Sequence, residues 1–566
     1  MLALLAGCTL TSGRKSSGKA LTGKSSAGQV DYSESAVKAR TESQAHYLDA
    51  ILQEQSDEFE SAADSYYRAA LADPSNEPLI IEATSRLLRL RQSEKPDEKT
   101  ARLNERIVEL LKKATSYPNA SGVLFARLGL AYSMIGKKDL AIEANRQAIK
   151  RMPGLLSGYQ YLAQIHLQGG QAEEGLKVLD EAARQQGVDS AFLIDLAETY
   201  IAFGRAGSMD TIRARATEAF KRASTFRTTN PVQLQRLADG FNALGETDLA
   251  LAAYQQLLER LPNLTAIRDK LVELYLRKQD STNAAIHLRA IVRESPSDAK
   301  SHYLLGSILF EDKHPEEAAE SFRRTILINP NFEPAYHDLA AALMNAEKST
   351  EALETLEKAR GKFQQNFVCE FYSALAFSRL KDYANSLKHF TTAEVIARAT
   401  ATNRLNHTFY FQLGAAYERN QKFKEAETYF RKALEASPDF AEALNYLGYM
   451  WAERGENLQE ALAMIEKAVK FEPKNAAFLD SLGWVLFKLN KPEEALPHML
   501  KSIEFNDEPD ATLYDHLGDI YAALKKPAKA REAWQKSISI EPSDKVRGKI
   551  QSTDSTATPA PRSATR

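Results

Sequence analysis

The chain repeats itself about every 34 residues along most of its length. Three segments show the repeat best, beginning at His407, Ala477 and Thr512. Each contains Leu-Gly, then a small residue twelve positions after the glycine, then a large apolar residue four positions later. A fixed period of this length is typical of stacked helix pairs in which each unit packs only against its neighbours. The sequence therefore predicts a repeat array and not several separate globular domains.

Small residues recur at two positions of the period, which we call the first and second small positions. The first holds Gly129, Ala163, Ala197, Ala238, Gly306, Ala340, Ala374, Gly414, Gly448, Gly483 and Gly518. The second holds Ala141, Gly175, Ala216, Ala250, Ala284, Ala318, Ala352, Ser386, Ala426, Ala461, Ala495 and Ala530. Two helices approach closely only where the facing side chains are small. Large residues beside these positions are expected to fill the space that remains: Phe220, Tyr254, Leu288, Phe322, Leu356, Phe390, Phe430, Ile465, Met499 and Trp534.

Prolines recur where the second helix of each unit must end. They are Pro153, Pro262, Pro296, Pro330, Pro438, Pro473 and Pro542. Proline has no backbone N–H and cannot continue a helix, so it is expected just after a helix terminus.

The small, large and proline positions together resemble the tetratricopeptide repeat (TPR) family. The resemblance covers residues 43–544, about fourteen units, of which the first two are degenerate. It implies an all-α, right-handed superhelical solenoid of helix-turn-helix repeats. A helical array of another type is the alternative. We expect residues 545–566 to form a disordered basic tail and residues 9–42 a flexible tether rich in Ser, Gly and Lys.

Residues 1–8 end in Leu5-Ala6-Gly7-Cys8, which resembles the lipobox of bacterial lipoproteins, where the cysteine carries the lipid. Only seven residues precede Cys8, so the signal segment is truncated, and an upstream start would restore it. The resemblance implies an anchor at the outer membrane, facing the periplasm. The alternative is a chance match in a cytoplasmic protein.

The charge of the chain is distributed unevenly. Its net charge is −2, with charged residues making up 26%. Residues 9–30 and residues 545–566 each carry +4, which leaves −10 on the repeat body. This composition does not indicate a nucleic-acid-binding protein.

The sequence contains only weak matches to nucleotide-binding, metal-binding or catalytic motifs. Gly18–Ser25 matches the phosphate-loop pattern GxxxxGK[ST], but no strand precedes it, so we expect no nucleotide binding. The ten histidines form no metal-binding spacing. Adjacent glutamates such as Glu493-Glu494 begin second helices, where acids complement the helix dipole. We therefore expect no catalytic residue, cofactor, metal or small-molecule substrate.

The last units hold all three tryptophans, Trp451, Trp484 and Trp534. In the TPR family the first helix of each unit lines the concave face. Mapping that face by resemblance selects seven candidate partner-binding residues: Asn445, Tyr449, Asp480, Trp484, Phe487, Asp515 and Asp519. Aromatic and acidic side chains together suit a basic or aromatic-containing protein segment. Packing of Trp484 and Phe487 within or between units is an equal alternative.

These observations predict a non-enzymatic scaffold or adaptor for protein–protein interactions. The two resemblances together imply a bacterial envelope lipoprotein that supports an assembly or export machinery. A cytosolic adaptor or chaperone-like TPR protein is one alternative. A regulatory array that partners a separate enzyme chain is another.

Overall fold

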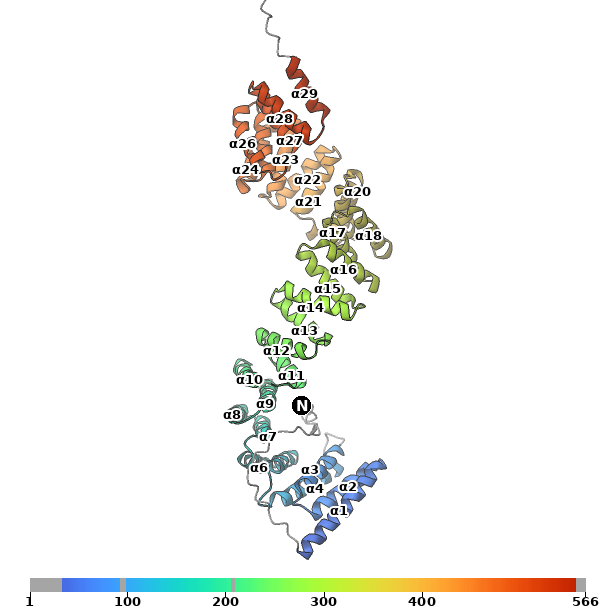
Figure 1. Cartoon of the computed structure of the whole chain (residues 1–566), viewed down its shortest axis with the longest axis vertical. Coiled ribbons are helices and arrows are strands. Elements are labelled where there is room, and N and C mark those ends of the chain that lie inside the picture. The colour runs from blue at the N-terminus through green and yellow to red at the C-terminus, as the bar shows by residue number, and fades with distance from the viewer. Residues whose placement is uncertain (1–32, 92–97, 205–208, 227, 556–566) are drawn as a thin grey trace, which may run out of the picture. The chain divides into compact units, whose positions relative to one another are not determined.

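The structure, a computed structural model, describes residues 33–91, 98–204, 209–226 and 228–555, and all regular elements in these ranges are helices (Figure 1). The chain forms two compact units, Met1–Pro262 and Asn263–Arg566. In the described ranges, helices α1 to α28 form fourteen consecutive pairs, and α29 follows the last pair. The predicted all-α array of about fourteen helix pairs is confirmed. Cys8 and the Gly18–Ser25 segment lie outside the described residues.

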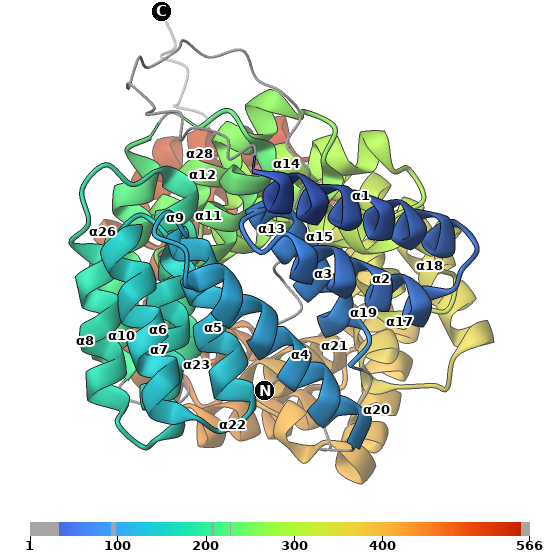
Figure 2. The ribbon, with the colours of Figure 1, turned by 90° about the horizontal axis from the view of Figure 1, so that it is seen from below.

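The first unit contains six pairs. Its helices are α1 (Glu34–Gln55), α2 (Phe59–Ala72), α3 (Glu77–Arg89), α4 (Glu98–Thr115), α5 (Gly122–Met134), α6 (Lys138–Arg151), α7 (Leu156–Gln168), α8 (Ala172–Ala183), α9 (Ser190–Phe203), α10 (Met209–Ser224), α11 (Pro231–Ala243) and α12 (Thr247–Arg260). Each helix packs against the next, and Figure 2 shows α6, α7 and α8 side by side.

The second unit contains eight pairs and the final helix. Its helices are α13 (Thr265–Arg277), α14 (Ser281–Glu294), α15 (Ala299–Glu311), α16 (Pro315–Ile328), α17 (Glu333–Asn345), α18 (Ser349–Lys362), α19 (Phe367–Arg379), α20 (Tyr383–Thr400), the 3-10 turn η3 (Thr402–Arg404), α21 (His407–Arg419), α22 (Phe423–Ala436), α23 (Ala441–Arg454), α24 (Leu458–Phe471), α25 (Ala476–Lys488), α26 (Pro492–Phe505), α27 (Ala511–Ala523), α28 (Pro527–Ile540) and α29 (Asp544–Ser555). Here α23 contacts α25 and α25 contacts α27. The first helices of these pairs therefore form an inner row.

The two small positions and the large residue pack as the sequence predicts. In the pair α21–α22, Gly414 faces Phe430, and a Cβ on Gly414 would lie 2.8 Å from the Cδ1 atom of Phe430. Ala426, at the second small position, is fully buried, as is Phe430. The ring of the second helix therefore occupies the space that the missing side chain of the first helix leaves.

The turn inside each pair and the end of each second helix are formed by recurring residue types. The α23–α24 turn contains two residues with positive φ, Gly455 and Asn457, and each other fully described turn inside a pair contains one, such as Lys525 at 57°. It lets the N–H of Lys526 donate to the carbonyl of Tyr521 at 2.9 Å, which satisfies a helix-terminal carbonyl. Each predicted proline lies two residues after the end of a second helix, as Pro438 does after α22.

Two expected boundaries differ from the structure. Helix α1 begins at Glu34, inside the segment expected to be a tether, because Ser33 caps it and Ser43 donates to the carbonyl of Ala69 at 2.9 Å. Helix α29 covers the first part of the expected tail, because Val546 is buried against the last pair. Both segments are rich in polar residues, so the sequence did not predict the helices α1 and α29.

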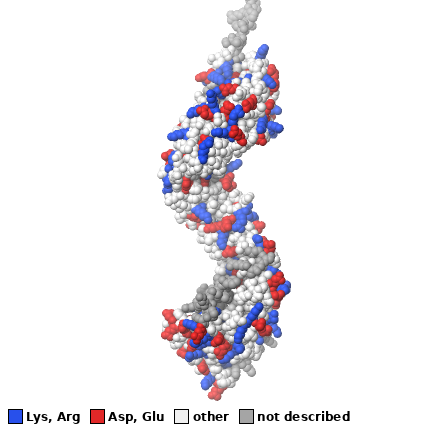
Figure 3. All heavy atoms as spheres, turned by 180° about the vertical axis from the view of Figure 1, so that it is seen from behind, with Lys and Arg blue, Asp and Glu red and all other residues white. Residues whose placement is uncertain are grey.

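No helix within the described ranges combines the length and the apolar character that a bilayer crossing needs. The face in Figure 3 shows Lys and Arg interspersed with Asp and Glu.

A carboxylate lies in the core of the second unit, where the repeat pattern predicts no charge. Glu370 of α19 is 1% exposed. It accepts hydrogen bonds from Arg360 Nε at 3.1 Å and Gln365 Nε2 at 3.1 Å, and it pairs with His389 Nδ1 at 2.6 Å. Burial acts to raise the pKa of Glu370, but the hydrogen bonds from His389 and Gln365 and the charge of Arg360 outweigh it and lower the pKa to about 2.

We expect Glu370→Gln to destabilise the second unit in a pH-dependent way. A pKa lowered from 4.5 to about 2 stabilises the fold fully above about pH 4.5, and this stabilisation is lost as the pH falls toward 2. At neutral pH the variant should lose about 3 kcal/mol of unfolding free energy. Urea unfolding across this range measures the difference, which should shrink on acidification.

Glu354→Gln, at an exposed position of α18, is the matched control and should change little. A stability loss in Glu370→Gln that stays constant from neutral pH to pH 2 would contradict the assigned ionisation.

Candidate functional site

The candidate residues lie on the inner row of helices α23, α25 and α27. Asn445 and Tyr449, Asp480 and Trp484, and Asp515 and Asp519 are each four residues apart, so each couple shares one helix face. The structure divides these six residues and Phe487 into two groups, one around Trp484 and one around Asp519.

Trp484 is the centre of an aromatic stack between consecutive pairs. Its ring lies 3.8 Å from that of His516 and 5.0 Å from that of Phe487, nearly parallel to both. Its indole Nε1 donates to the carboxylate of Glu453 on α23. Trp484 is 6% exposed, whereas Phe487 is half-buried. The indole is therefore mostly used in packing between pairs, whereas part of Phe487 remains accessible.

Asp480 connects two pairs through a buried contact. Its Oδ1 lies 2.8 Å from Nδ1 of His516 on α27. Both side chains are almost fully buried. This contact orients the imidazole ring of His516, which stacks on Trp484. Asp480 therefore positions the aromatic stack.

Tyr449 lies half-buried among carboxylates. Burial raises the pKa of Tyr449, and the negative charges of Glu453, Asp480 and Glu418 raise it further. Burial also raises the pKa of Glu418. One turn away, Asn445 has a buried Oδ1 with no hydrogen-bond partner among the described residues. Aromatic rings, carboxylates and this amide oxygen can all accept a cation or an N–H donor.

Asp515 and Asp519 form the second group, at the end of the array. Lys549 of α29 places its Nζ 2.6 Å from Asp515 Oδ1 and 2.6 Å from Asp519 Oδ2. Asp519 also accepts a hydrogen bond from Trp534 Nε1 at 3.1 Å. Both carboxylates are thus occupied by the chain's own C-terminal helix.

Sequence reasoning missed four residues that complete these groups: Glu418, Glu453, His516 and Lys549. Glu453 lies four residues after Tyr449, so helical spacing could have found it. Lys549 could not have been found, because its segment was expected to be a tail.

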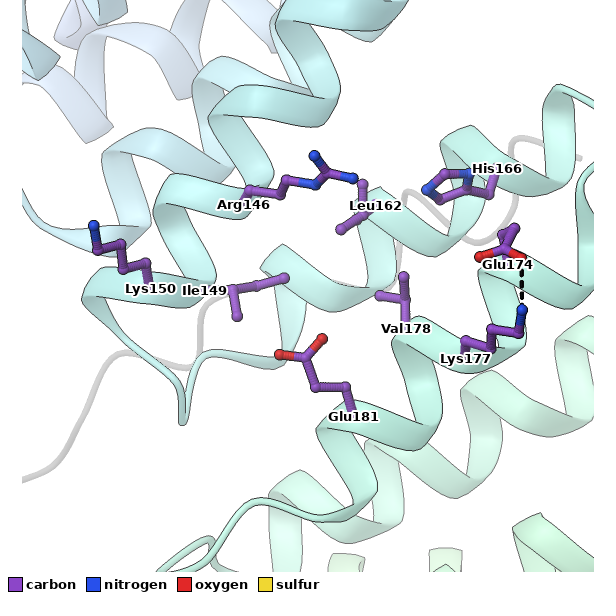
Figure 4. A pocket seen from close by; sticks show the side chains of 9 residues that line it. All are labelled: Arg146, Ile149, Lys150, Leu162, His166, Glu174, Lys177, Val178 and Glu181. Carbon is purple, nitrogen blue, oxygen red and sulfur yellow. Dashed lines mark hydrogen bonds and ion pairs between the residues drawn. The ribbon is translucent and has the colours of Figure 1, made fainter.

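A separate groove lies in the first unit across α6, α7 and α8 (Figure 4), with a volume of about 480 Å³. Arg146 and Lys150 project from one side, and Glu181 points in from the other. Glu174 and Lys177 pair at 2.7 Å on the same side as Glu181. Because both signs of charge line it, the groove selects neither an acidic nor a basic partner.

In the part of the chain that the structure describes, no three His, Cys, Asp or Glu side chains are grouped so that they could hold a metal ion. The site residues instead offer hydrogen-bond acceptors and aromatic surfaces.

Known proteins share this chain's repeat. A tetratricopeptide repeat model matches residues 236–299, 270–332 and 411–476, and a second such model matches residues 511–544. Tetratricopeptide repeat protein 21B of Xenopus laevis is 24% identical over 205 residues, which are 35% of this chain and 15% of that protein. The peroxisomal targeting signal receptor of Eremothecium gossypii is 24% identical over 223 residues, 39% of this chain and 37% of the receptor. The matches thus span well under half the length of these relatives.

Two solved structures align with most of this chain. A chain of the APC/C hetero-tetramer Cut9–Hcn1 aligns with 80% of this chain and 93% of its own length, at 15% identity and a TM-score of 0.39. Yeast Tom70 aligns with 84% of this chain and 95% of its own length, at 14% identity and a TM-score of 0.32. The matching repeat models show that this chain contains tetratricopeptide repeats, and the paired helices of the structure continue the same helix-pair arrangement along the described residues.

Proposed function

We propose that this repeat protein is a non-catalytic scaffold that binds basic, aromatic-containing protein segments on the inner helices of its second unit. The observation that carries the proposal is that the charges of Glu453, Asp480 and Glu418 act on half-buried Tyr449. Phe487, which stacks on Trp484 of the same inner row, is half-buried as well. Carboxylates attract a cationic segment, and aromatic rings add contact area at low entropic cost.

We also propose that the scaffold works in a bacterial cell envelope, lipid-anchored at the outer membrane, where it supports an assembly or export machinery. The support is the segment Leu5-Ala6-Gly7-Cys8, which resembles a lipobox and precedes the repeat array. An anchored array of this kind would hold its protein-binding face near the membrane.

We expect a short labelled peptide containing Lys, Arg and Phe to bind the full chain in a salt-dependent way. Exposed charges are screened within about 10 Å at 0.1 M salt, so affinity should fall as salt rises. Glu453→Gln, which removes an exposed carboxylate, should weaken binding roughly threefold, the size expected for an accessible ion pair. Fluorescence anisotropy measures both effects.

The matched control is Glu504→Gln, which removes an exposed carboxylate from the second helix α26. Trp484→Ala is unsuitable as a binding test, because a buried tryptophan cavity lowers stability by about 3–5 kcal/mol. Equal peptide affinities for the wild type, Glu453→Gln and Glu504→Gln would rule out this part of the inner row as the binding face.

The membrane proposal is tested at Cys8. Expressed from a complete upstream start in bacterial cells, the wild-type chain should sediment with membranes, whereas Cys8→Ser should move to the soluble fraction because the lipid acceptor is lost. Fractionation followed by immunoblotting measures the change. Identical fractionation of the two proteins would favour the cytosolic adaptor.

A further inference from the structure

Helix α29 is seated on the last helix pair through a small amphipathic face. Val546 is buried with Ala530 and Trp534, and Ile550 packs at the edge of the same cluster. Between these two aliphatic contacts, Lys549 reaches the carboxylates of Asp515 and Asp519. The face of α27 and α28 therefore recognises two aliphatic side chains and one ammonium group.

The same arrangement occurs one pair earlier. There, the carboxylate of Asp480 on α25 contacts Nδ1 of His516 on α27, the first helix of the next pair. In the corresponding way, the carboxylate of Asp515 on α27 accepts a hydrogen bond from Nζ of Lys549 on α29. Helix α29 thus takes the place that the first helix of a further pair would take, and it is the last helix within the described residues.

The hold of α29 on this face is weak compared with that of a regular first helix. Helix α25 buries nine residues, whereas Val546 is the buried residue of α29 among those whose side chains are described. Gly548 lies in the middle of α29, and a Cβ there would meet nothing within 4 Å. A glycine in an open helix position lowers helix stability and contributes no contact.

We propose that the face formed by Asp515, Asp519, Tyr521, Trp534 and Ile538 is a docking surface for a basic amphipathic helix of a partner protein. Helix α29 occupies this surface in the free chain, and the partner helix displaces it. The partner presents Lys or Arg between two aliphatic residues on one helix face, as Val546, Lys549 and Ile550 do. This inference rests on the proposed function in that the chain binds protein segments. It concerns a different surface from Tyr449 and the carboxylates of Glu418, Glu453 and Asp480, which we call the Tyr449 group.

The test uses the chain's own helix as the probe. A fluorescein-labelled peptide of residues 541–555 is titrated into the full chain and into the full chain carrying Lys549→Glu. In the variant, Asp515 and Asp519 repel the attached helix, so the surface opens to the peptide. We expect at least tenfold tighter binding to the variant than to the wild type, because the attached helix competes at high effective concentration in the wild type.

Two controls locate the binding. Adding Asp515→Asn and Asp519→Asn to the variant should remove the gain, and a peptide carrying Lys549→Glu should not bind. Equal peptide affinities for the wild type and the Lys549→Glu chain would overturn the proposal.

Hydrogen exchange of the wild-type chain gives a reading that does not depend on how the variant folds. Excess peptide of residues 541–555, isotope-labelled so that its fragments differ in mass from those of the attached helix, should increase deuterium uptake in α29, because the attached helix is displaced. Unchanged uptake would overturn the displacement. This readout follows α29 alone, so it can fail while basic peptides still bind at the Tyr449 group, and the reverse outcome is equally distinguishable.

Discussion

The array depends on one contact that recurs in its helix pairs, a large side chain of the second helix set against a small residue of the first. Gly414 faces Phe430, and Gly518 faces Trp534 in the same manner. The backbones can approach closely because the first helix carries no Cβ there, and the ring fills the remaining space. Stacking against the next pair then covers the faces that a single pair leaves open.

This dependence on neighbours also builds the candidate site. Trp484 is held by Glu453 of the preceding pair and by His516 of the following pair. Asp480 belongs to one pair and contacts the histidine of the next. No single repeat contains the site, so its shape follows from the stacking of three pairs.

The sequence predicted the fold well in the segments where the same residue types recur at the same positions of the repeat. The small positions, the large residues and prolines such as Pro438 all report local requirements of helix contact and helix termination, and a period makes them visible. The prediction failed at both ends of the array. Helix α1 begins at Glu34 and α29 at Asp544, in segments whose polar composition hides the few contacts that hold them.

The geometry of the candidate site could be predicted only in part, because its members were chosen by helix phase alone. Phase indicates that Tyr449 and Trp484 lie on first helices of their pairs, and in the structure they lie on α23 and α25. It could not show that Trp484 is 6% exposed, since that burial comes from His516 and Phe487 together. Nor could it show that Asp515 and Asp519 already pair with Lys549, which reaches them from a segment outside the repeat.

The central claim, that the small position is required by the facing ring, is tested most directly by Gly414→Ala against Gly361→Ala. Alanine is favoured over glycine inside a helix by about 1 kcal/mol, so propensity alone would stabilise both variants. At Gly361 a Cβ meets nothing within 4 Å, whereas at Gly414 it lies 2.8 Å from buried Phe430. Urea unfolding should therefore show Gly361→Ala unchanged or more stable and Gly414→Ala less stable, by about 1–3 kcal/mol. Equal stabilisation of both variants would contradict the account.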